Sequence, residues 1–432
     1  MPGETRRRHY HIWTIGCQMN KAESERLGSL LQQRGYESTA IPEKADLVVV
    51  NSCVVRESAE NRVVNKLHSL RQLKRLHPDL TIAVTGCFVD TDETVLKKTY
   101  PHVDFFFRAG DLPQWIDEIK PAEMLPERST VSVYVPIMQG CNNFCTYCIV
   151  PFRRGRERSR PVEEIVEESS RLVDRGAKEI VLLGQNVDSY GRDLPDQPDL
   201  AGLLTQLNSV PGLLRIRFLT NHPKDMSLKL IQSVARLDKV CEQINLPVQA
   251  GDDLVLDAMK RGYTVDQYRR LVDEIRLHVP GVAISTDLIV GFPGESEAQF
   301  QHSVDLLSEL RFDAVHVACY SPRRGTYAAR HLEDDVPAAE KRRRLKVVEE
   351  LQERVCSEIN DRLLGESVEV LVEGKTRGKW RGRTRSDKLV FFSVPGDFQG
   401  RLVNIIIRKA SAWSLQGDPA DGLSTGSNKE EL

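Results

Sequence analysis

The sequence predicts an α/β protein of three domains, and three observations support this. Short apolar strands alternate with amphipathic helices along most of the chain, which is typical of parallel sheets. A glycine-rich β pattern without helices is confined to the C-terminal part. The length of 432 residues fits about three domains of ordinary size.

The first domain is expected over residues 8–122. It alternates three apolar strands with two amphipathic helices, so βαβ units and a parallel sheet are predicted. The strands are His11–Gly16, Asp46–Asn51 and Thr81–Gly86, and the helices are Lys21–Gly35 and Glu57–Leu76. A linker, Pro121–Thr130, follows.

The second domain is expected over residues 130–364, with helices between successive strands and a long charged helix, Ala338–Leu364, at its end. Its six predicted strands are Val131–Met138, Glu179–Gly184, Leu214–Thr220, Gln243–Val248, Ala283–Val290 and Ala314–Tyr320. Six such units can form an open sheet or a partial barrel. In both folds ligands bind at the carboxyl ends of the strands.

The third domain, over residues 365–416, is predicted to be a small all-β module. Its expected strands are Val368–Glu373, Leu389–Val394 and Leu402–Lys409, with glycines at the turns. The remaining residues, 417–432, are rich in Gly, Ser and Asp, so a disordered tail is expected.

Composition and charge limit the classes of protein. Hydrophobic residues make up 40 %, and no apolar run approaches the roughly 20 residues of a membrane-spanning helix. The basic N-terminus lacks an apolar segment behind it, so we expect a cytoplasmic protein with no membrane partner. The net charge of −2 conceals two basic segments, Arg153–Arg160 and Lys375–Lys388, which fit a polyanionic partner.

The clearest chemical signal is Cys141-Asn-Asn-Phe-Cys145-Thr-Tyr-Cys148, directly after the first strand of the second domain. Thiolates are the usual ligands of iron–sulfur clusters. Three thiolates leave one iron of a four-iron cluster open, and an open metal position is where substrates bind. A zinc site with a distant fourth ligand, or three buried cysteines, are the alternative interpretations.

Three further cysteines share one position relative to the sheet of the first domain. Cys17, Cys53 and Cys87 each lie at or just past the end of a predicted strand. Because the carboxyl ends of parallel strands meet at one edge, these residues can converge despite their separation in sequence. Otherwise each is a small buried apolar residue.

The spacing of Cys141, Cys145 and Cys148 resembles the radical S-adenosylmethionine superfamily. This resemblance implies a partial (βα)6 barrel and a 4Fe–4S cluster whose open iron binds S-adenosylmethionine and cleaves it to a radical. Five residues on or just past the predicted strands are candidates for contacting S-adenosylmethionine, the alternative being a turn or helix-cap role. They are Gln185, Asn186, Gln249, Asp287 and Gly291.

The two cysteine sets in this order resemble the methylthiotransferase family. The resemblance implies a second 4Fe–4S cluster on Cys17, Cys53 and Cys87 that carries the transferred sulfur. One S-adenosylmethionine would then supply the radical and another the methyl group, so no catalytic residue beyond the cluster ligands is expected. An external electron donor and a sulfur donor are also implied, and a monomer is expected.

The third domain resembles the TRAM module, a small RNA-binding β-barrel. Its basic residues suit phosphate contacts, and Trp380 among them suits base stacking, whereas a solvated hairpin is the alternative. The RNA is then expected to lie across the mouth of the barrel, held by this domain. The candidate RNA-binding residues are Lys375, Arg377, Lys379, Trp380, Arg381, Arg383 and Arg385.

Three branches of the family compete as models for the substrate. They act on N6-isopentenyladenosine in the anticodon stem-loop of tRNA, on N6-threonylcarbamoyladenosine in tRNA, and on an aspartate of a small-subunit ribosomal protein. Four segments resemble the first, MiaB-type branch, although that branch more often has serine at Asn221 and Ser-Gly-Ser at Ala250–Asp252. The segments are Leu183–Val187, Asn221–Pro223, Leu246–Gln249 and Lys260–Gly262.

The remaining signals are weaker. Arg153–Arg160 either meets substrate phosphates or caps the first barrel helix. Cys241, Cys319 and Cys356 show no spacing pattern and are expected to serve packing. A protein of another class, an iron–sulfur protein that binds RNA or carries electrons without catalysis, would need clusters without open irons. Neither cysteine set supplies the fourth thiolate for that.

Overall fold

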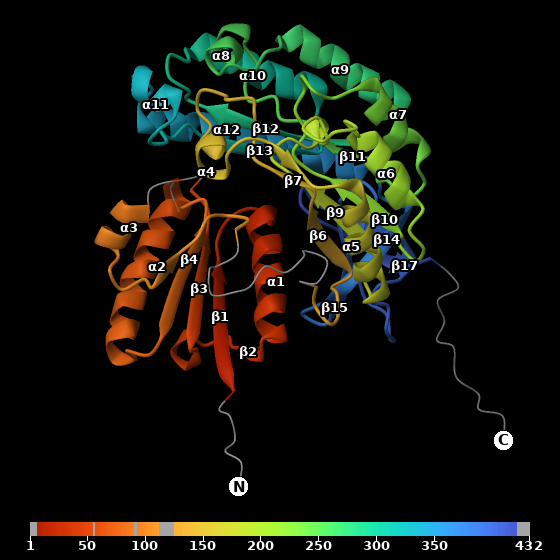
Figure 1. The fold of residues 1–432 in the computed structure, drawn as a ribbon. Helices are drawn as coiled ribbons and strands as arrows, with labels where there is room; N and C mark the ends of the chain where they lie inside the picture. The colour runs from red at the N-terminus through yellow and green to blue at the C-terminus, as the bar shows by residue number, and fades with distance from the viewer. Residues whose placement is uncertain (1–6, 55–56, 90–92, 112–124, 421–432) are drawn as a thin grey trace, which may run out of the picture.

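The computed structural model describes residues 7–54, 57–89, 93–111 and 125–420. Three domains are visible: a sheet domain, an open barrel surrounded by helices, and a small closed β-barrel at the C-terminus (Figure 1). Part of the predicted linker and most of the predicted tail lie outside the described residues. Within the described ranges, no helix is long and apolar enough to span a membrane.

The first domain is a parallel sheet in the order β2-β1-β3-β4-β5. The central strands β1 (Arg8–Thr14), β3 (Leu47–Ser52) and β4 (Thr81–Gly86) confirm the three predicted strands. The short edge strands β2 (Tyr36–Ser38) and β5 (Phe105–Phe106) escaped prediction because two or three residues leave no period to detect. The helices are α1 (Gln18–Gln33), α2 (Glu57–Leu76) and α3 (Glu93–Thr99), with a 3-10 turn η1 (Pro42–Lys44).

The second domain is a partial barrel of six parallel strands in two three-stranded sheets, β10-β9-β6 and β11-β12-β13. A single pair, Ile216 with Val240, bridges the two sheets. All six predicted strands are confirmed, as β6 (Ser132–Pro136), β9 (Glu179–Leu183), β10 (Arg215–Phe218), β11 (Gln243–Asn245), β12 (Ala283–Val290) and β13 (Ala314–Cys319). A small hairpin, β7 (Met138–Gln139) with β8 (Arg158–Ser159), flanks the cysteine loop.

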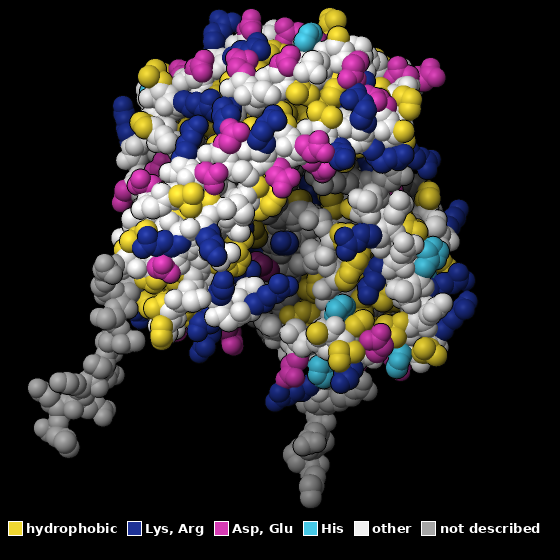
Figure 2. Space-filling view, turned by 180° about the vertical axis from the view of Figure 1, so that it is seen from behind, with side chains coloured by type: hydrophobic (Ala, Val, Ile, Leu, Met, Phe, Trp, Pro, Cys, Tyr) yellow, Lys and Arg dark blue, Asp and Glu magenta, His cyan; other side chains and the backbone are white. Residues whose placement is uncertain are grey.

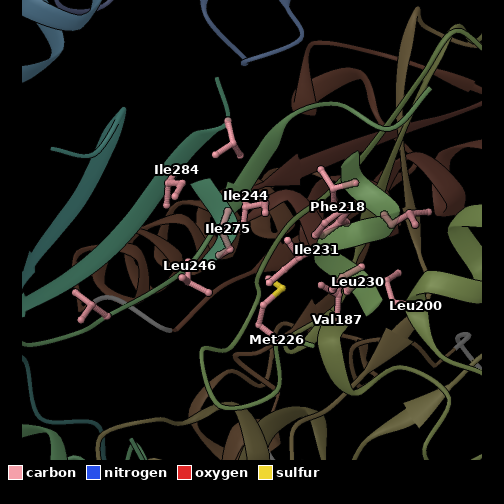
Figure 3. Close-up of a cluster of buried hydrophobic side chains, with 14 of the residues drawn as sticks. Val187, Leu200, Phe218, Met226, Leu230, Ile231, Ile244, Leu246, Ile275 and Ile284 are labelled. Atoms are coloured by element: carbon pink, nitrogen blue, oxygen red, sulfur yellow. The ribbon is translucent and has the colours of Figure 1, made fainter. Parts of the chain in front are cut away.

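Helices cover the outer face of this barrel, and their apolar sides pack on the strands in one continuous core (Figure 3). Phe218, Ile244 and Ile284 point outward from the strands and meet Ile231 and Ile275 from the helices. The helices are α5 (Val162–Asp174), α6 (Leu200–Asn208), α7 (Leu228–Arg236), α8 (Asp253–Ala258), α9 (Val265–His278), α10 (Glu297–Leu310), α11 (Tyr327–His331) and α12 (Ala338–Asp361). A short helix, α4 (Val150–Arg154), follows the cysteine loop, and a 3-10 turn, η3 (Val187–Ser189), follows β9.

The inner faces of β6 and β9 pack against the first domain. Tyr134, Val181 and Leu183 point inward from β6 and β9, and they form a separate apolar cluster with Met19 and Ala22 of α1. At the barrel edge, Arg26 of α1 donates to Glu168 of α5 at 2.6 Å. The first turns of α1 thus lie against the carboxyl half of the barrel strands.

The third domain is a closed barrel in the order β14-β15-β16-β18-β17. It confirms the three predicted strands and adds β15 and β18, which are mostly polar and each contain one glycine. The strands are β14 (Ser367–Thr376), β15 (Lys379–Thr384), β16 (Leu389–Phe392), β17 (Leu402–Ala410) and β18 (Leu415–Pro419). The predicted boundary at residue 416 is wrong, because β18 continues to Pro419 and pairs with β16 and β17.

The third domain docks on the amino ends of the barrel strands, opposite the cysteine loop. Arg215 and Arg217, both buried, donate from β10 to the carbonyl oxygens of Arg383 (2.6 Å) and Thr384 (2.6 Å). Arg217 also pairs with the buried Glu179 at 2.9 Å. A buried charge needs such partners, so this network fixes the position of the small barrel.

Replacing Arg217 with Met should lower the free energy of unfolding by about 3–5 kcal/mol, because Glu179 would remain buried without its cation. Chemical denaturation followed by circular dichroism measures the change. The control is Arg171→Ala, which removes an exposed pair with Glu167 and should cost less than about 0.5 kcal/mol. Equal effects of the two substitutions would show that the buried network does not hold the domains together.

Candidate functional site

The first cysteine set converges at the carboxyl edge of the first sheet, as the strand positions predict. The backbone N–H of Cys87 donates to the Ser52 carbonyl at 2.8 Å, which places Cys87 beside Cys53. A Cβ on Gly16 would lie 2.6 Å from Cys53 Cβ, so the backbone just before Cys17 touches Cys53. Burial raises the pKa of the Cys87 thiol, and the nearby Cys17 adds to this rise.

The second set lies in a loop at the carboxyl end of β6. Cys148 N–H donates to the Cys145 carbonyl at 3.0 Å, which folds the loop back on itself. Burial raises the pKa of Cys141 to about 11 and that of Cys148 to about 12, and the neighbouring thiols contribute in each case. These thiols stay protonated near neutral pH until a metal displaces the protons.

All nine cysteines lie within the described residues, and none forms a disulfide. Within those residues, no three His, Cys, Asp or Glu side chains group as tightly as one metal ion requires. A four-iron cluster binds each thiolate through a different iron and therefore needs a wider spacing. The donor chemistry of each set, three thiols without a fourth, suits a four-iron cluster with one open position.

Three contacts from the barrel hold the cysteine loop. The Gln185 side chain, just past β9, accepts from the backbone N–H of Gly140 at 2.6 Å. The Thr146 hydroxyl donates to the Ala258 carbonyl at 2.8 Å. Arg261 donates to Cys145 Sγ at 3.4 Å and to the Pro247 carbonyl at 2.9 Å, so a buried cation faces the thiols.

Arg154 joins the two cysteine sets. It ends α4, six residues after Cys148, and its side chain is buried against the first domain. Its guanidinium donates to both carboxylate oxygens of Glu23 at 2.6 and 3.3 Å and, through Nε, to Cys87 Sγ at 3.3 Å. The sequence predicts that Arg153–Arg160 either meets substrate phosphates or caps the first barrel helix. Neither role applies to Arg154, because its partners, Glu23 and Cys87, lie in the first domain.

Of the five residues predicted to contact S-adenosylmethionine, four lie past the carboxyl ends of barrel strands, and Asp287 lies within β12. Gln185 has a structural role in the cysteine loop, and Asn186 is buried with Nδ2 donating to Asp225 at 2.8 Å. Gln249 has φ = +74°, and Asp287 accepts from Asn245 at 3.2 Å. A Cβ on Gly291 would lie 2.4 Å from the Lys341 side chain, so this position requires glycine for packing.

Sequence reasoning did not assign a role to a polar group at the end of β10. Asn221 and His222 are buried and bind Asp188, which accepts from His222 N at 2.8 Å. Burial raises the pKa of Asp188 to about 7 and lowers that of His222. Asn186 Oδ1, Asn221 Oδ1 and His222 Nε2 are buried, with no protein partner in the described chain. The sequence signal from which this group could be found is the Asn221–Pro223 segment, which resembles the MiaB-type branch.

The basic residues of the third domain divide into two groups. Lys375, Arg377, Lys379 and Arg381 are exposed. Arg385, in contrast, pairs with Glu242 at 2.7 Å in the docking interface, and Arg383 is half-buried and pairs with Asp387 at 3.2 Å. These last two arginines make contacts within the protein. The side chain of Arg385 is engaged in the docking interface, so the prediction that it contacts RNA is wrong. Arg383 has an ion pair with Asp387 that the prediction did not include.

The prediction that Trp380 stacks on a base is wrong. Only 4 % of Trp380 is exposed, because the residue belongs to the core of the small barrel and packs edge-on against Phe398. Its indole N–H donates to the Val394 carbonyl at 3.2 Å, and Lys375 covers its ring at 4.2 Å. The alternation of inward and outward residues in β15 places Trp380 inside and its basic neighbours outside.

The three unpatterned cysteines lie away from both sets. Cys241 and Cys356 are buried, and Cys356 donates to the Asp313 carbonyl at 3.0 Å. Cys319 is partly buried against the barrel core. Their surroundings agree with the packing role that the sequence indicates.

The fold and the two cysteine sets define the class: a radical S-adenosylmethionine enzyme with a cysteine-lined domain before its barrel and an RNA-binding module after it. Three family models agree with these parts. They are the radical SAM superfamily over residues 135–307, an uncharacterized family designated UPF0004 over residues 9–108, and the TRAM domain over residues 361–420.

Curated relatives match almost the whole chain. A tRNA-2-methylthio-N(6)-dimethylallyladenosine synthase of Dehalococcoides mccartyi is 55 % identical over 96 % of this chain and 98 % of its own. The synthase of Chloroflexus aurantiacus is 50 % identical over 96 % of this chain and 92 % of its own. The chain therefore belongs to the family of tRNA-2-methylthio-N(6)-dimethylallyladenosine synthases.

A solved structure shares the fold. The radical S-adenosylmethionine methyltransferase TsrM from Kitasatospora setae, determined with cobalamin and a [4Fe-4S] cluster, has a TM-score of 0.52, with 74 % of each chain covered. Its sequence identity is 13 %, so this likeness concerns the fold alone.

In the metal-free protein, alkylation by iodoacetamide at pH 8 should modify Cys17 well before Cys141. Cys17 is exposed, whereas a pKa of about 11 leaves about one Cys141 thiol in a thousand ionised at pH 8. The Cys141 rate should then rise about tenfold per pH unit toward pH 11. Peptide mass spectrometry measures both sites, and equal rates at pH 8 would contradict the burial of Cys141.

Proposed function

We propose that this protein converts N6-isopentenyladenosine beside the anticodon of tRNA into its 2-methylthio derivative. The observation that carries the proposal is the pairing of two three-thiol sites across one domain junction, with Arg154 spanning it. Relatives that match this chain over almost their whole length bear the name of this activity, and three family models match the three domains of this chain.

Cys141, Cys145 and Cys148 would hold the first 4Fe–4S cluster, which when bound supplies the electron that cleaves S-adenosylmethionine to a 5′-deoxyadenosyl radical. The barrel positions this site through Gln185 and Thr146, which fix the loop, and through Arg261. The Arg261 cation lies 3.4 Å from Cys145 Sγ and lowers the energy of negative charge on the thiolates. The candidates for contacting S-adenosylmethionine at the barrel mouth are Asn186, Gln249, Asp287 and Gly291.

Cys17, Cys53 and Cys87 would hold a second 4Fe–4S cluster, which when bound provides the open iron that carries the transferred sulfur. Arg154 donates to Cys87 Sγ and is itself held by Glu23, so it orients this thiolate and offsets its charge. A second S-adenosylmethionine as methyl donor, an external electron donor and an external sulfur donor complete the reaction, and we expect a monomer to perform it.

The structure also explains one departure from the MiaB-type pattern. Asp252 stands where serine is more usual, and its carboxylate caps α8 by accepting from Leu254 N at 3.0 Å and Val255 N at 3.2 Å. Serine caps helices in the same way. This difference concerns the start of a helix, so it is no argument for either of the other two substrates.

Reconstituted, reduced protein incubated with S-adenosylmethionine, sulfide and tRNA carrying N6-isopentenyladenosine should form the 2-methylthio nucleoside. Nucleoside mass spectrometry after digestion detects the product. The matched control is tRNA carrying N6-threonylcarbamoyladenosine, which should remain unmodified. Formation of 5′-deoxyadenosine without the methylthio product would keep the radical chemistry and overturn the substrate.

Alanine at Cys17, Cys53 and Cys87 together should leave about four irons per chain and retain S-adenosylmethionine cleavage, while methylthio transfer is lost. The matched variant with alanine at Cys141, Cys145 and Cys148 should also keep about four irons but lose the cleavage. Iron analysis and 5′-deoxyadenosine formation give the two readouts. Loss of cleavage in both variants would contradict the separate roles of the two sites.

A further inference from the structure

The buried state of Trp380 leaves the stacking of RNA bases to other aromatic residues. One lies within the cysteine loop and another directly after it. Phe144 stands between Cys141 and Cys145, and Phe152 lies on α4, which Figure 1 shows at the junction of the first domain and the barrel. Phe152 is 44 % exposed, and Phe144 is partly exposed.

The two rings form a small surface of their own. They meet edge-to-face with their centroids 6.2 Å apart. The guanidinium of Arg156 lies 4.3 Å from the centre of the Phe144 ring. Neither phenylalanine belongs to any hydrophobic core of the described chain. We call Phe144, Phe152 and Arg156 the aromatic platform.

The platform has the charge that a nucleic acid requires. Arg156 and Arg158 are exposed next to it, while the intervening Glu157 is engaged by Asn142, whose backbone N–H donates to it at 3.1 Å. Lys and Arg side chains also gather around the hollow that Figure 2 shows between the first and third domains. Cations beside exposed rings are typical of single-stranded RNA sites, where bases stack and phosphates meet Arg.

Phe144 also has φ = +51°, a backbone conformation that bulky side chains rarely adopt. Backbone strain of this kind persists where the surrounding structure enforces it. Here it occurs between two thiols of the cysteine loop, Cys141 and Cys145, so a base lying on the platform would be next to this loop.

We propose that the aromatic platform stacks a nucleobase of the anticodon loop next to the target adenosine. This inference rests on the proposed function and adds the means by which the RNA is held at the barrel mouth. The third domain docks at the opposite end of the barrel, so it is unsuited to orient the reacting base. The platform supplies that contact.

The test uses the full-length protein and an anticodon stem-loop RNA with 2-aminopurine beside the target adenosine, since stacking quenches this fluorophore. Binding to the parent protein should quench the fluorescence. Phe152→Ala should weaken RNA binding about tenfold and reduce the quenching, because base–aromatic stacking contributes on that scale. Phe152→Trp, which keeps an aromatic ring, should bind the RNA and quench the fluorescence like the parent protein. Phe144→Leu should lose affinity and quenching as Phe152→Ala does.

The control is Phe105→Ala, which removes a comparably exposed ring (39 %) from the edge strand of the first sheet and should bind RNA like the parent. Iron content and thermal unfolding verify that each variant is folded. Unchanged affinity and quenching in Phe152→Ala and Phe144→Leu would overturn the platform even if the parent forms the methylthio nucleoside. Quenching that depends on Phe152, in a protein that forms no such product, would instead support the platform and overturn the proposed function.

Discussion

The packing of α1 against the inner face of the open barrel is the constraint on which the rest of the structure depends. Six strands do not close a barrel, so the inward side chains of β6 and β9 need an apolar partner. Met19 and Ala22 provide it from the first two turns of α1. Because Cys17 immediately precedes this helix, the contact that completes the barrel core also brings the first cysteine set to the barrel mouth.

The junction between the two cysteine sets is polar and charged. Arg154 leaves the barrel immediately after the cysteine loop and ends in the first domain, on Glu23 and Cys87. At the other side of the junction Arg323 pairs with Glu60 of α2 at 3.0 Å. Ile149 adds an apolar contact to the core of the first domain. The cluster loop is therefore part of the domain interface as well as a set of ligands.

Much of this could be predicted because the signals are local or periodic. The three central strands of the first sheet, the six barrel strands, and the convergence of Cys17, Cys53 and Cys87 follow from βα alternation. The role of Trp380 could not be predicted in the same way. Its neighbours are basic, but the alternation along a strand turns every second residue inward, and β15 itself was not predicted. In the sequence, Arg154 and Arg385 belong to basic segments, whereas their carboxylate partners, Glu23 and Glu242, lie more than a hundred residues away.

The docking of the small barrel has a consequence for how the family can vary. Arg215 and Arg217 bind main-chain carbonyl oxygens of residues 383–385, and these oxygens are present whatever side chains the segment carries. Drift in the hairpin sequence therefore leaves these main-chain bonds intact as long as Arg385, whose side chain pairs with Glu242, is kept. The exposed strand face can acquire new RNA contacts independently. An RNA-binding module attached by its backbone and one arginine can be re-specified on its exposed face without redesign of the barrel beneath it.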